Sequence, residues 1–240
     1  MWTPIRTADG SWTLRNDELG QACHSLSGAW EQARLRYAGP CRVREVALER
    51  GVVRLLDIGT GLGLNLAAAL AALDGTGARL EAVTFERDAE VLASARALVD
   101  WPSDCAPWVA RVHAALAGDS GLGLKVHVEL GDARERVTAA PDASFDAVFL
   151  DPFSPQVAPE LWSETFLSLV ASKLASGGVL STYSASFPVR LALARAGLAV
   201  GRGPRVGTKA EGTLASRGVP LPGLEPRLAR RLARRIQGAS

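Results

Sequence analysis

Apolar residues along the chain alternate between short runs and longer stretches with helical spacing. The short runs predict strands at 52–58, 80–86, 125–130, 145–151 and 179–184. The helical spacing predicts helices at 64–73, 88–99, 159–174 and 187–196. Because strands alternate with helices, we predict an α/β fold with a mostly parallel, doubly wound sheet.

Both ends of the chain depart from this alternation. Segments 3–7 and 12–15 flank an Ala-Asp-Gly-Ser turn and predict an N-terminal hairpin, and 27–37 predicts a helix. Segments 198–206 and 209–215 predict a closing pair in which the last strand runs antiparallel. The sheet is therefore expected to carry an antiparallel last strand and a hairpin extension.

We expect three parts: an N-terminal extension at 1–50, a core domain at 51–216 and a basic tail at 217–240. Within the core, 101–123 is rich in Pro, Gly and Trp and predicts an irregular insertion with one helix near 107–117. The run Ser-Gly-Gly at 176–178 predicts the C-cap of the preceding helix.

Composition narrows the class of protein. With 240 residues, 48% apolar and 22% charged, the chain suits one soluble globular domain with additions. No apolar run approaches the roughly 18–20 residues that span a bilayer, and the N-terminus has no signal-peptide core. The scattered Cys23, Cys41 and Cys105 lack metal-ligand spacing, so we expect a cytoplasmic protein with reduced thiols and no metal site.

Charge is unevenly distributed. Residues 187–240 hold eleven Lys or Arg against two acids, a net charge of +9, whereas 1–186 hold 16 basic and 23 acidic residues. Such a basic segment binds a polyanion such as nucleic acid, or simply keeps the chain soluble. Its end, 228–236, predicts either a short basic amphipathic helix or a disordered tail.

The most informative stretch is 55–63, Leu-Leu-Asp-Ile-Gly-Thr-Gly-Leu-Gly, a strand that runs into a glycine-rich turn. Gly59 and Gly61 fit a dinucleotide fingerprint, but its third glycine falls one place early, at Gly63. Asp57 would repel a pyrophosphate but could bind the ammonium group of S-adenosylmethionine. The pattern favours that cofactor, with a glycine-rich turn of another nucleotide protein as the alternative.

Two further acids follow predicted strands. Glu86 lies 25 residues beyond Gly61, near the spacing that places an acid on ribose hydroxyls. Asp132 follows the strand at 125–130. Ligands bind at the carboxyl edge of a parallel sheet, so three acids at that edge indicate a site more strongly than any one of them.

Residues 151–155, Asp-Pro-Phe-Ser-Pro, follow the fourth predicted strand. We expect them to bind the substrate that accepts a methyl group from S-adenosylmethionine. Asp151 could accept the protons of an amine and stabilise the positive charge that forms on its nitrogen, while Phe153 offers a flat face. The alternative for Asp151 is a turn-forming Asp before Pro. The sequence has no Gly-x-Ser-x-Gly elbow and no paired Cys/His signature. This fits direct transfer of the methyl group to the substrate, without a covalent enzyme intermediate.

These residues resemble a specific family, the MnmC-like methyltransferases. The matching stretches are 7–14, 24–25, 28–31, 56–65, 151–155, 159–162, 182–184, 189–190, 196–197 and 207–209. The resemblance covers roughly 3–216. The chain departs from the family at Ala158, where an asparagine is usual, and at Ala210, where a basic residue is common. No family counterpart is placed for 101–123.

The resemblance implies a Rossmann-like class I methyltransferase that methylates the 5-aminomethyl group of the modified wobble uridine of transfer RNA. It would be a stand-alone form without the oxidase domain. The implied S-adenosyl-L-methionine residues are Asp57, Gly59, Gly61, Gly63, Asn65, Glu86, Asp132, Ala133 and Asp151. Asp151 would hold the amine with Phe153 near the uracil, and the basic end would meet the anticodon stem-loop of tRNA.

Other functions stay open on the sequence. One keeps the reaction but changes the acceptor to a small-molecule or protein amine. Another is a catalytically silent subunit with the cofactor fold that binds RNA or a partner. A third is an aminopropyl transferase, which shares the fold and uses the decarboxylated cofactor.

Overall fold

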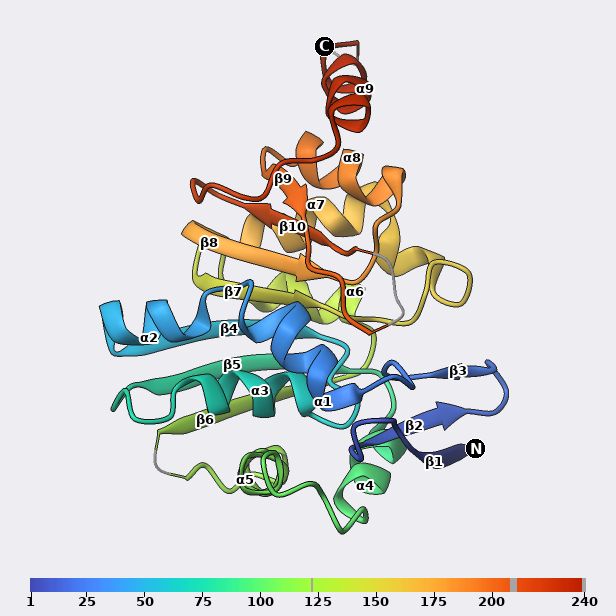
Figure 1. The fold of residues 1–240 in the computed structure, drawn as a ribbon, viewed down its shortest axis with the longest axis vertical. Coiled ribbons are helices and arrows are strands. Elements are labelled where there is room, and N and C mark those ends of the chain that lie inside the picture. Colours follow the sequence, from blue (N-terminus) through green and yellow to red (C-terminus); the bar gives the residue numbers. More distant parts are fainter. Residues whose placement is uncertain (122, 208–210, 239–240) are drawn as a thin grey trace.

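A computed structural model describes residues 1–121, 123–207 and 211–238. Its main sheet has the strand order β6-β5-β4-β7-β8-β10-β9 (Figure 1). The strands are β4 (Val52–Ile58), β5 (Arg79–Glu86), β6 (Leu124–Leu130), β7 (Phe145–Leu150), β8 (Leu174–Thr182), β9 (Ala199–Arg202) and β10 (Thr213–Ser216). Strands β4 to β8 pair in parallel, and β10 pairs antiparallel with β8 and β9. The predicted α/β fold with an antiparallel last strand is confirmed.

Helices cover both faces of this sheet (Figure 1). They are α1 (Ala29–Gln32), η1 (Ala33–Ala38), α2 (Val43–Arg50), α3 (Leu64–Ala72), α4 (Ala89–Arg96), α5 (Ala106–Leu116), α6 (Ala133–Arg136), η2 (Val137–Ala139), η3 (Pro159–Trp162), α7 (Glu164–Lys173), α8 (Phe187–Arg195) and α9 (Pro226–Gln237). Leu55 and Phe149 pack into one apolar cluster, while their neighbours Leu56 and Leu150 pack into the other. Burial on both faces explains why the central strands read as continuous apolar runs.

The N-terminal hairpin is also confirmed, within a small separate sheet. Strands β1 (Trp2–Arg6) and β2 (Trp12–Asn16) pair antiparallel, and β2 also pairs with β3 (Gln21–Ala22). The helical pattern at 27–37 forms α1, which continues directly into η1, a π-helix. The two-residue strand β3 is too short to give a sequence signal.

The predicted C-cap at 176–178 is wrong. Helix α7 ends at Lys173, and β8 begins at Leu174 and runs through both glycines. A Cβ on Gly178 would lie 2.9 Å from the carbonyl oxygen of Phe145. The glycine is therefore explained by the close approach of β7 and β8. The predicted helix at 159–174 is likewise split into η3 and α7, because Ser163 caps α7 by accepting from the amide of Phe166.

The segment 101–123 contains α5, which packs against α3 beside the glycine-rich turn. A Cβ on Gly63 would lie 2.9 Å from Cγ1 of Val112 on α5, so this glycine permits the helix to approach. Near the end of the chain, Pro226–Gln237 form the helix α9, which projects from the body of the molecule (Figure 1). Among the described residues, no helix is long and apolar enough to span a membrane.

Candidate active site

A cleft of about 610 Å³ opens where β4, β5, β6 and β7 end. Its inner wall comes from the main sheet, and its outer wall comes from the N-terminal sheet and the segment 152–161. Seven residues predicted from the sequence line it: Gly59, Gly61, Glu86, Asp132, Ala133, Asp151 and Phe153. Three do not: Asp57, Gly63 and Asn65.

The glycine-rich turn forms the floor of this cleft. Gly59 has φ +96°, and a Cβ there would lie 2.7 Å from the carbonyl oxygen of Asp151. Only glycine lets the end of β4 lie so close to the end of β7. The amide of Gly61 donates to Oε2 of Glu86 at 2.9 Å, which joins the turn to the end of β5.

Asp57 lies behind the turn and is fully buried. Its Oδ2 accepts a hydrogen bond from Thr84 Oγ1 at 2.8 Å, while Oδ1 has no partner among the described residues. Burial, with repulsion from Asp151 and Glu86, raises the pKa of the Asp57 carboxyl well above its usual value, although the Thr84 bond opposes this. Asp57 therefore lies behind the lining of the cleft, where burial favours its neutral form and a cation bound in the cleft would favour its charged form.

Glu86 and Asp132 both line the cleft, but their pKa values are shifted in opposite directions. Glu86 accepts from the amides of Gly61 and Asp88, and burial raises its pKa. Asp132 caps α6 by accepting from the amide of Arg134, and it also pairs with the Arg134 guanidinium, whose hydrogen bonds lower the Asp132 pKa. The carboxylate of Asp132 is therefore already engaged by its own helix.

Asp151 is held from both sides at the end of β7. The Tyr37 hydroxyl donates to its Oδ1 at 2.5 Å, and Asn65 Nδ2 donates to its Oδ2 at 2.9 Å. The side chain is 9% exposed, to the cleft. Burial, followed by the charge of Asp151, raises the Tyr37 pKa well above its usual value, so this hydroxyl stays a donor. Both carboxylate oxygens are therefore fixed in place, in a residue that lines the cleft.

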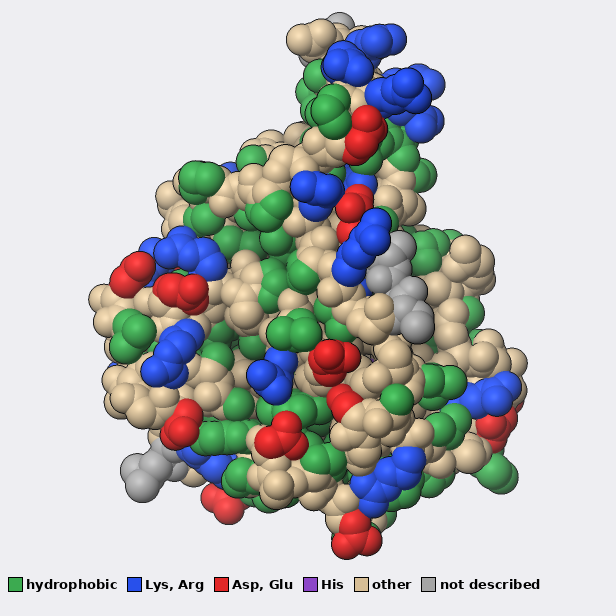
Figure 2. All heavy atoms as spheres, in the orientation of Figure 1, with side chains coloured by type: hydrophobic (Ala, Val, Ile, Leu, Met, Phe, Trp, Pro, Cys, Tyr) green, Lys and Arg blue, Asp and Glu red, His purple; other side chains and the backbone are tan. Residues whose placement is uncertain are grey.

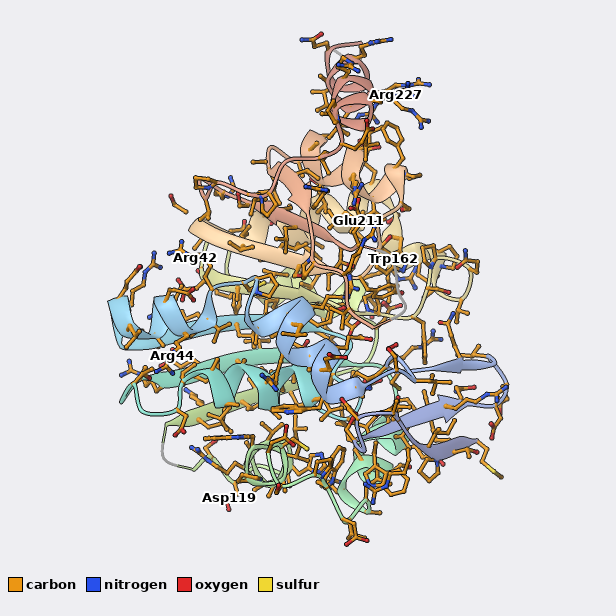
Figure 3. All side chains as sticks on the ribbon, viewed as in Figure 1. Arg42, Arg44, Asp119, Trp162, Glu211 and Arg227 are labelled. Carbon is orange, nitrogen blue, oxygen red and sulfur yellow. The ribbon has the colours of Figure 1, made fainter. Side chains whose placement is uncertain are left out.

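The segment after Asp151 is tied down through its backbone. Tyr183 donates to the carbonyl oxygen of Pro152 at 2.8 Å, and Trp162 Nε1 donates to that of Phe153 at 2.8 Å. Trp162, which is labelled in Figure 3, is buried. The sequence did not single out Tyr37, Tyr183 or the hairpin residue Trp2 for this site. Tyr37 belonged only to the helical pattern at 27–37, and Tyr183 only to the stretch 182–184 that resembles the family.

The charge of the cleft fits a cationic ligand. Its described lining carries the carboxylates Glu18, Glu86, Asp88, Asp132, Asp151 and Glu160. Against them stands Arg87, the one Lys or Arg in that lining. Such a wall repels phosphate and attracts the sulfonium and ammonium groups of S-adenosyl-L-methionine, and the unpartnered Oδ1 of Asp57 is free to accept a hydrogen bond. The described residues hold no group of three His, Cys, Asp or Glu suited to a metal ion.

Comparison with known proteins supports the cofactor class. A family model described as S-adenosyl-L-methionine-dependent methyltransferase matches residues 101–218, which include the segment for which we placed no counterpart. The crystal structure of MNMC2 from Aquifex aeolicus is 36% identical with a TM-score of 0.83, over 97% of this chain and 76% of that one.

Two curated proteins extend the comparison. The tRNA 5-methylaminomethyl-2-thiouridine biosynthesis bifunctional protein MnmC of Aromatoleum aromaticum is 32% identical over 205 residues, 78% of this chain and 31% of that protein. An uncharacterised protein of Methanocaldococcus jannaschii is 28% identical over 217 residues, 88% of this chain and 58% of that protein. The chain thus spans about a third of the bifunctional relative. By its fold, its cleft and these similarities, the chain belongs to the MnmC-like family of S-adenosyl-L-methionine-dependent methyltransferases.

Proposed function

We propose that the protein methylates the nitrogen of a 5-aminomethyl group on the modified wobble uridine of tRNA. The observation that carries the proposal is Asp151, which faces the cleft with both oxygens fixed by Tyr37 and Asn65. The name of the bifunctional relative, which concerns 5-methylaminomethyl-2-thiouridine in tRNA, supports this acceptor. The proposal implies a cytoplasmic enzyme that meets tRNA there.

Bound S-adenosyl-L-methionine supplies an electrophilic methyl group on a sulfonium. The turn from Gly59 to Gly63 would hold its methionine part, with Asp57 attracting the ammonium from behind the turn. Glu86 would accept from the ribose hydroxyls. Asp132 and Ala133 would lie at the adenine, where Asp132 would accept from the amino group with a lone pair that Arg134 leaves free.

On the acceptor side, the residues of this chain position an amine and stabilise charge. Asp151 would accept N–H bonds from the amine, so that the nitrogen lone pair points at the methyl group. As the nitrogen becomes positive, the fixed carboxylate stabilises it without reorganising. Alignment of this kind supplies much of the acceleration in an in-line displacement. Phe153 would lie near the uracil ring.

A tRNA partner is supported by α9. Arg227, Arg230, Arg231, Arg234 and Arg235 all lie on this helix, which contains no acid. Lys and Arg side chains crowd its surface in Figure 2, and Arg227 lies on the projecting helix in Figure 3. Leu232 is buried and the guanidinium of Arg231 packs over the ring of Phe187, which anchors the helix, while Arg227, Arg230 and Arg234 follow another face and are exposed. A surface of this kind binds phosphates.

The test is nucleoside mass spectrometry of tRNA that carries the 5-aminomethyl group, after incubation with the protein and labelled cofactor. We expect label in 5-methylaminomethyluridine. The Asp151→Ala variant should bind the cofactor in calorimetry with nearly unchanged affinity but transfer little label. Label appearing only in a panel of small amines or protein amines would replace the acceptor. Cofactor binding without turnover on any substrate would indicate a silent subunit.

A further inference from the structure

Two aromatic side chains from distant parts of the chain face the same cleft in nearly parallel planes. The ring centroids of Trp2 and Phe153 lie 6.1 Å apart, with 11° between the planes, and both residues line the cleft. Trp2 Nε1 donates to Oδ2 of Asp88 at 2.8 Å, at the start of α4. The indole is therefore held by its edge, which leaves its faces for packing.

The small N-terminal sheet positions this indole through its register. Trp2 pairs with Asn16, and Asn16 pairs with Gln21, so the three residues form one row across β1, β2 and β3. All three line the cleft. Directly paired residues of adjacent strands have side chains on the same face. One face of the sheet is thus presented to the cleft, with Trp2 at its end.

This sheet is clamped to the segment that carries Phe153. Gln21 Nε2 donates to Ser154 Oγ at 2.6 Å, and the amide of Ser154 donates to Gln21 Oε1 at 3.0 Å. Two hydrogen bonds between one side chain and one residue fix both distance and orientation. The clamp therefore sets the separation of Trp2 from Phe153, although 151 positions separate them in the sequence.

We propose that Trp2 and Phe153 together form the acceptor subsite, the part of the cleft that binds the base to be methylated. The pyrimidine ring bearing the amine stacks on the faces of these two aromatic side chains. This inference rests on the proposed function. Unpaired bases of RNA loops bind proteins by stacking on aromatic side chains, and every base offers such a face. Phe153 is two residues from Asp151, so a ring stacked here carries its aminomethyl substituent toward the carboxylate. The N-terminal sheet thereby completes a site that the cofactor domain leaves open.

The test compares Trp2→Ala and Trp2→Phe with Trp12→Ala. Trp12 is a matched control, because its indole lies on the same hairpin but packs against the Arg6 guanidinium, donates to the carbonyl oxygen of Val99 and does not line the cleft. For Trp2→Ala we expect kcat/KM for tRNA to fall roughly tenfold to a hundredfold, in keeping with the loss of one base stack. Trp2→Phe and Trp12→Ala should stay within about threefold, and cofactor affinity should change little in any variant.

A binding measurement needs no turnover. Uridine and 5-aminomethyluridine, added to the protein with S-adenosylhomocysteine, should quench tryptophan fluorescence in the wild type and less in Trp2→Phe. Equal quenching in both, or a Trp2→Ala variant that loses cofactor affinity in step with activity, would overturn the subsite. Failure of wild-type protein to methylate tRNA would instead refute the proposed function, and the nucleoside titration would still decide the role of Trp2.

Discussion

The hydroxyl of Tyr37 donates a 2.5 Å hydrogen bond to Oδ1 of Asp151, across 114 positions of the sequence. For Tyr37→Phe we expect kcat to fall about tenfold or more, because a hydrogen bond to a charged group contributes about 1.5–3 kcal/mol. The phenyl ring keeps its packing against Phe149, so the fold should persist. Single-turnover methyl transfer, with cofactor affinity from calorimetry, measures the effect.

The control for this variant is Tyr183→Phe, which removes a hydroxyl that donates to the carbonyl oxygen of Pro152. Its rate should fall less than that of Tyr37→Phe. If Tyr37→Phe were as fast as the wild type, the hydroxyl would not help to position Asp151.

A second prediction concerns the close approach of β4 and β7. Gly59→Ala should abolish cofactor binding and lower the unfolding temperature by several degrees, because the new Cβ would lie 2.7 Å from the Asp151 carbonyl oxygen. Gly75→Ala is the matched control, since Gly75 also has a positive φ but nothing within 4 Å of the added atom. That variant should lose only about 1–2 kcal/mol of stability and keep cofactor affinity. Calorimetry and thermal unfolding measure both variants. Equal losses of cofactor affinity and unfolding temperature in the two variants would mean that backbone strain alone, and not the contact with Asp151, causes the effect.

The buried carboxyl of Asp57 gives a prediction with a definite pH sign. The pKa of this carboxyl is higher in the folded state than in the unfolded state. Its favourable contribution to the free energy of unfolding is therefore present below the unfolded pKa and is lost as pH rises through the folded pKa. Asp57→Asn removes the charge and keeps the shape. Relative to wild type, the variant should therefore gain unfolding temperature at pH 8 and gain less at pH 5, while cofactor affinity falls.

Asp142→Asn provides the opposite case. Hydrogen bonding to Lys173 lowers the pKa of Asp142, so its contribution is present above the unfolded pKa and lost as pH falls. That variant should lose unfolding temperature at pH 8 and lose less near pH 4. Parallel trends for the two variants in scanning fluorimetry would contradict the burial argument for Asp57.

Local patterns in the sequence were enough to predict the sheet, the hairpin and the edge where the cleft lies. The glycine-rich turn and the strand-end acids identified that edge, because each signal lies within a few residues. The position of Asp57 behind the turn also has a local cause. Side chains of β4 point alternately to the two faces of the sheet, so Asp57 lies on the same face as Leu55. It therefore does not line the cleft.

The contacts that fix the site could not be predicted in the same way. The bond from Tyr37 to Asp151 and the clamp from Gln21 to Ser154 join segments more than 100 positions apart. Such pairs depend on how helices and strands pack, which no periodicity encodes. Two residues matched to the family near the end, Thr208 and Lys209, lie outside the described residues, as does the departure at Ala210.

The last prediction tests α9 as a phosphate-binding surface. Arg227, Arg230 and Arg234 are exposed and follow one face of the helix at spacings of three and four residues. Replacing all three by Gln should weaken tRNA binding and reduce the slope of log affinity against log salt by about two to three, since each phosphate contact contributes roughly 0.7–0.9. Methylation of the 5-aminomethyluridine nucleoside should be unchanged, because α9 supplies no residue to the cleft.

The matched control replaces Arg54, Arg79 and Lys125, which lie on β4, β5 and β6 away from their carboxyl ends, on the side of the sheet opposite the cleft. All three side chains are exposed, and replacing them by Gln removes the same charge as the α9 variant. An effect of net charge alone would therefore lower the slope equally in both triple variants. A smaller slope only in the α9 variant, in filter-binding titrations from low to physiological salt, assigns the phosphate contacts to that helix. An unchanged slope in the α9 variant would leave tRNA to be bound by another surface of the protein.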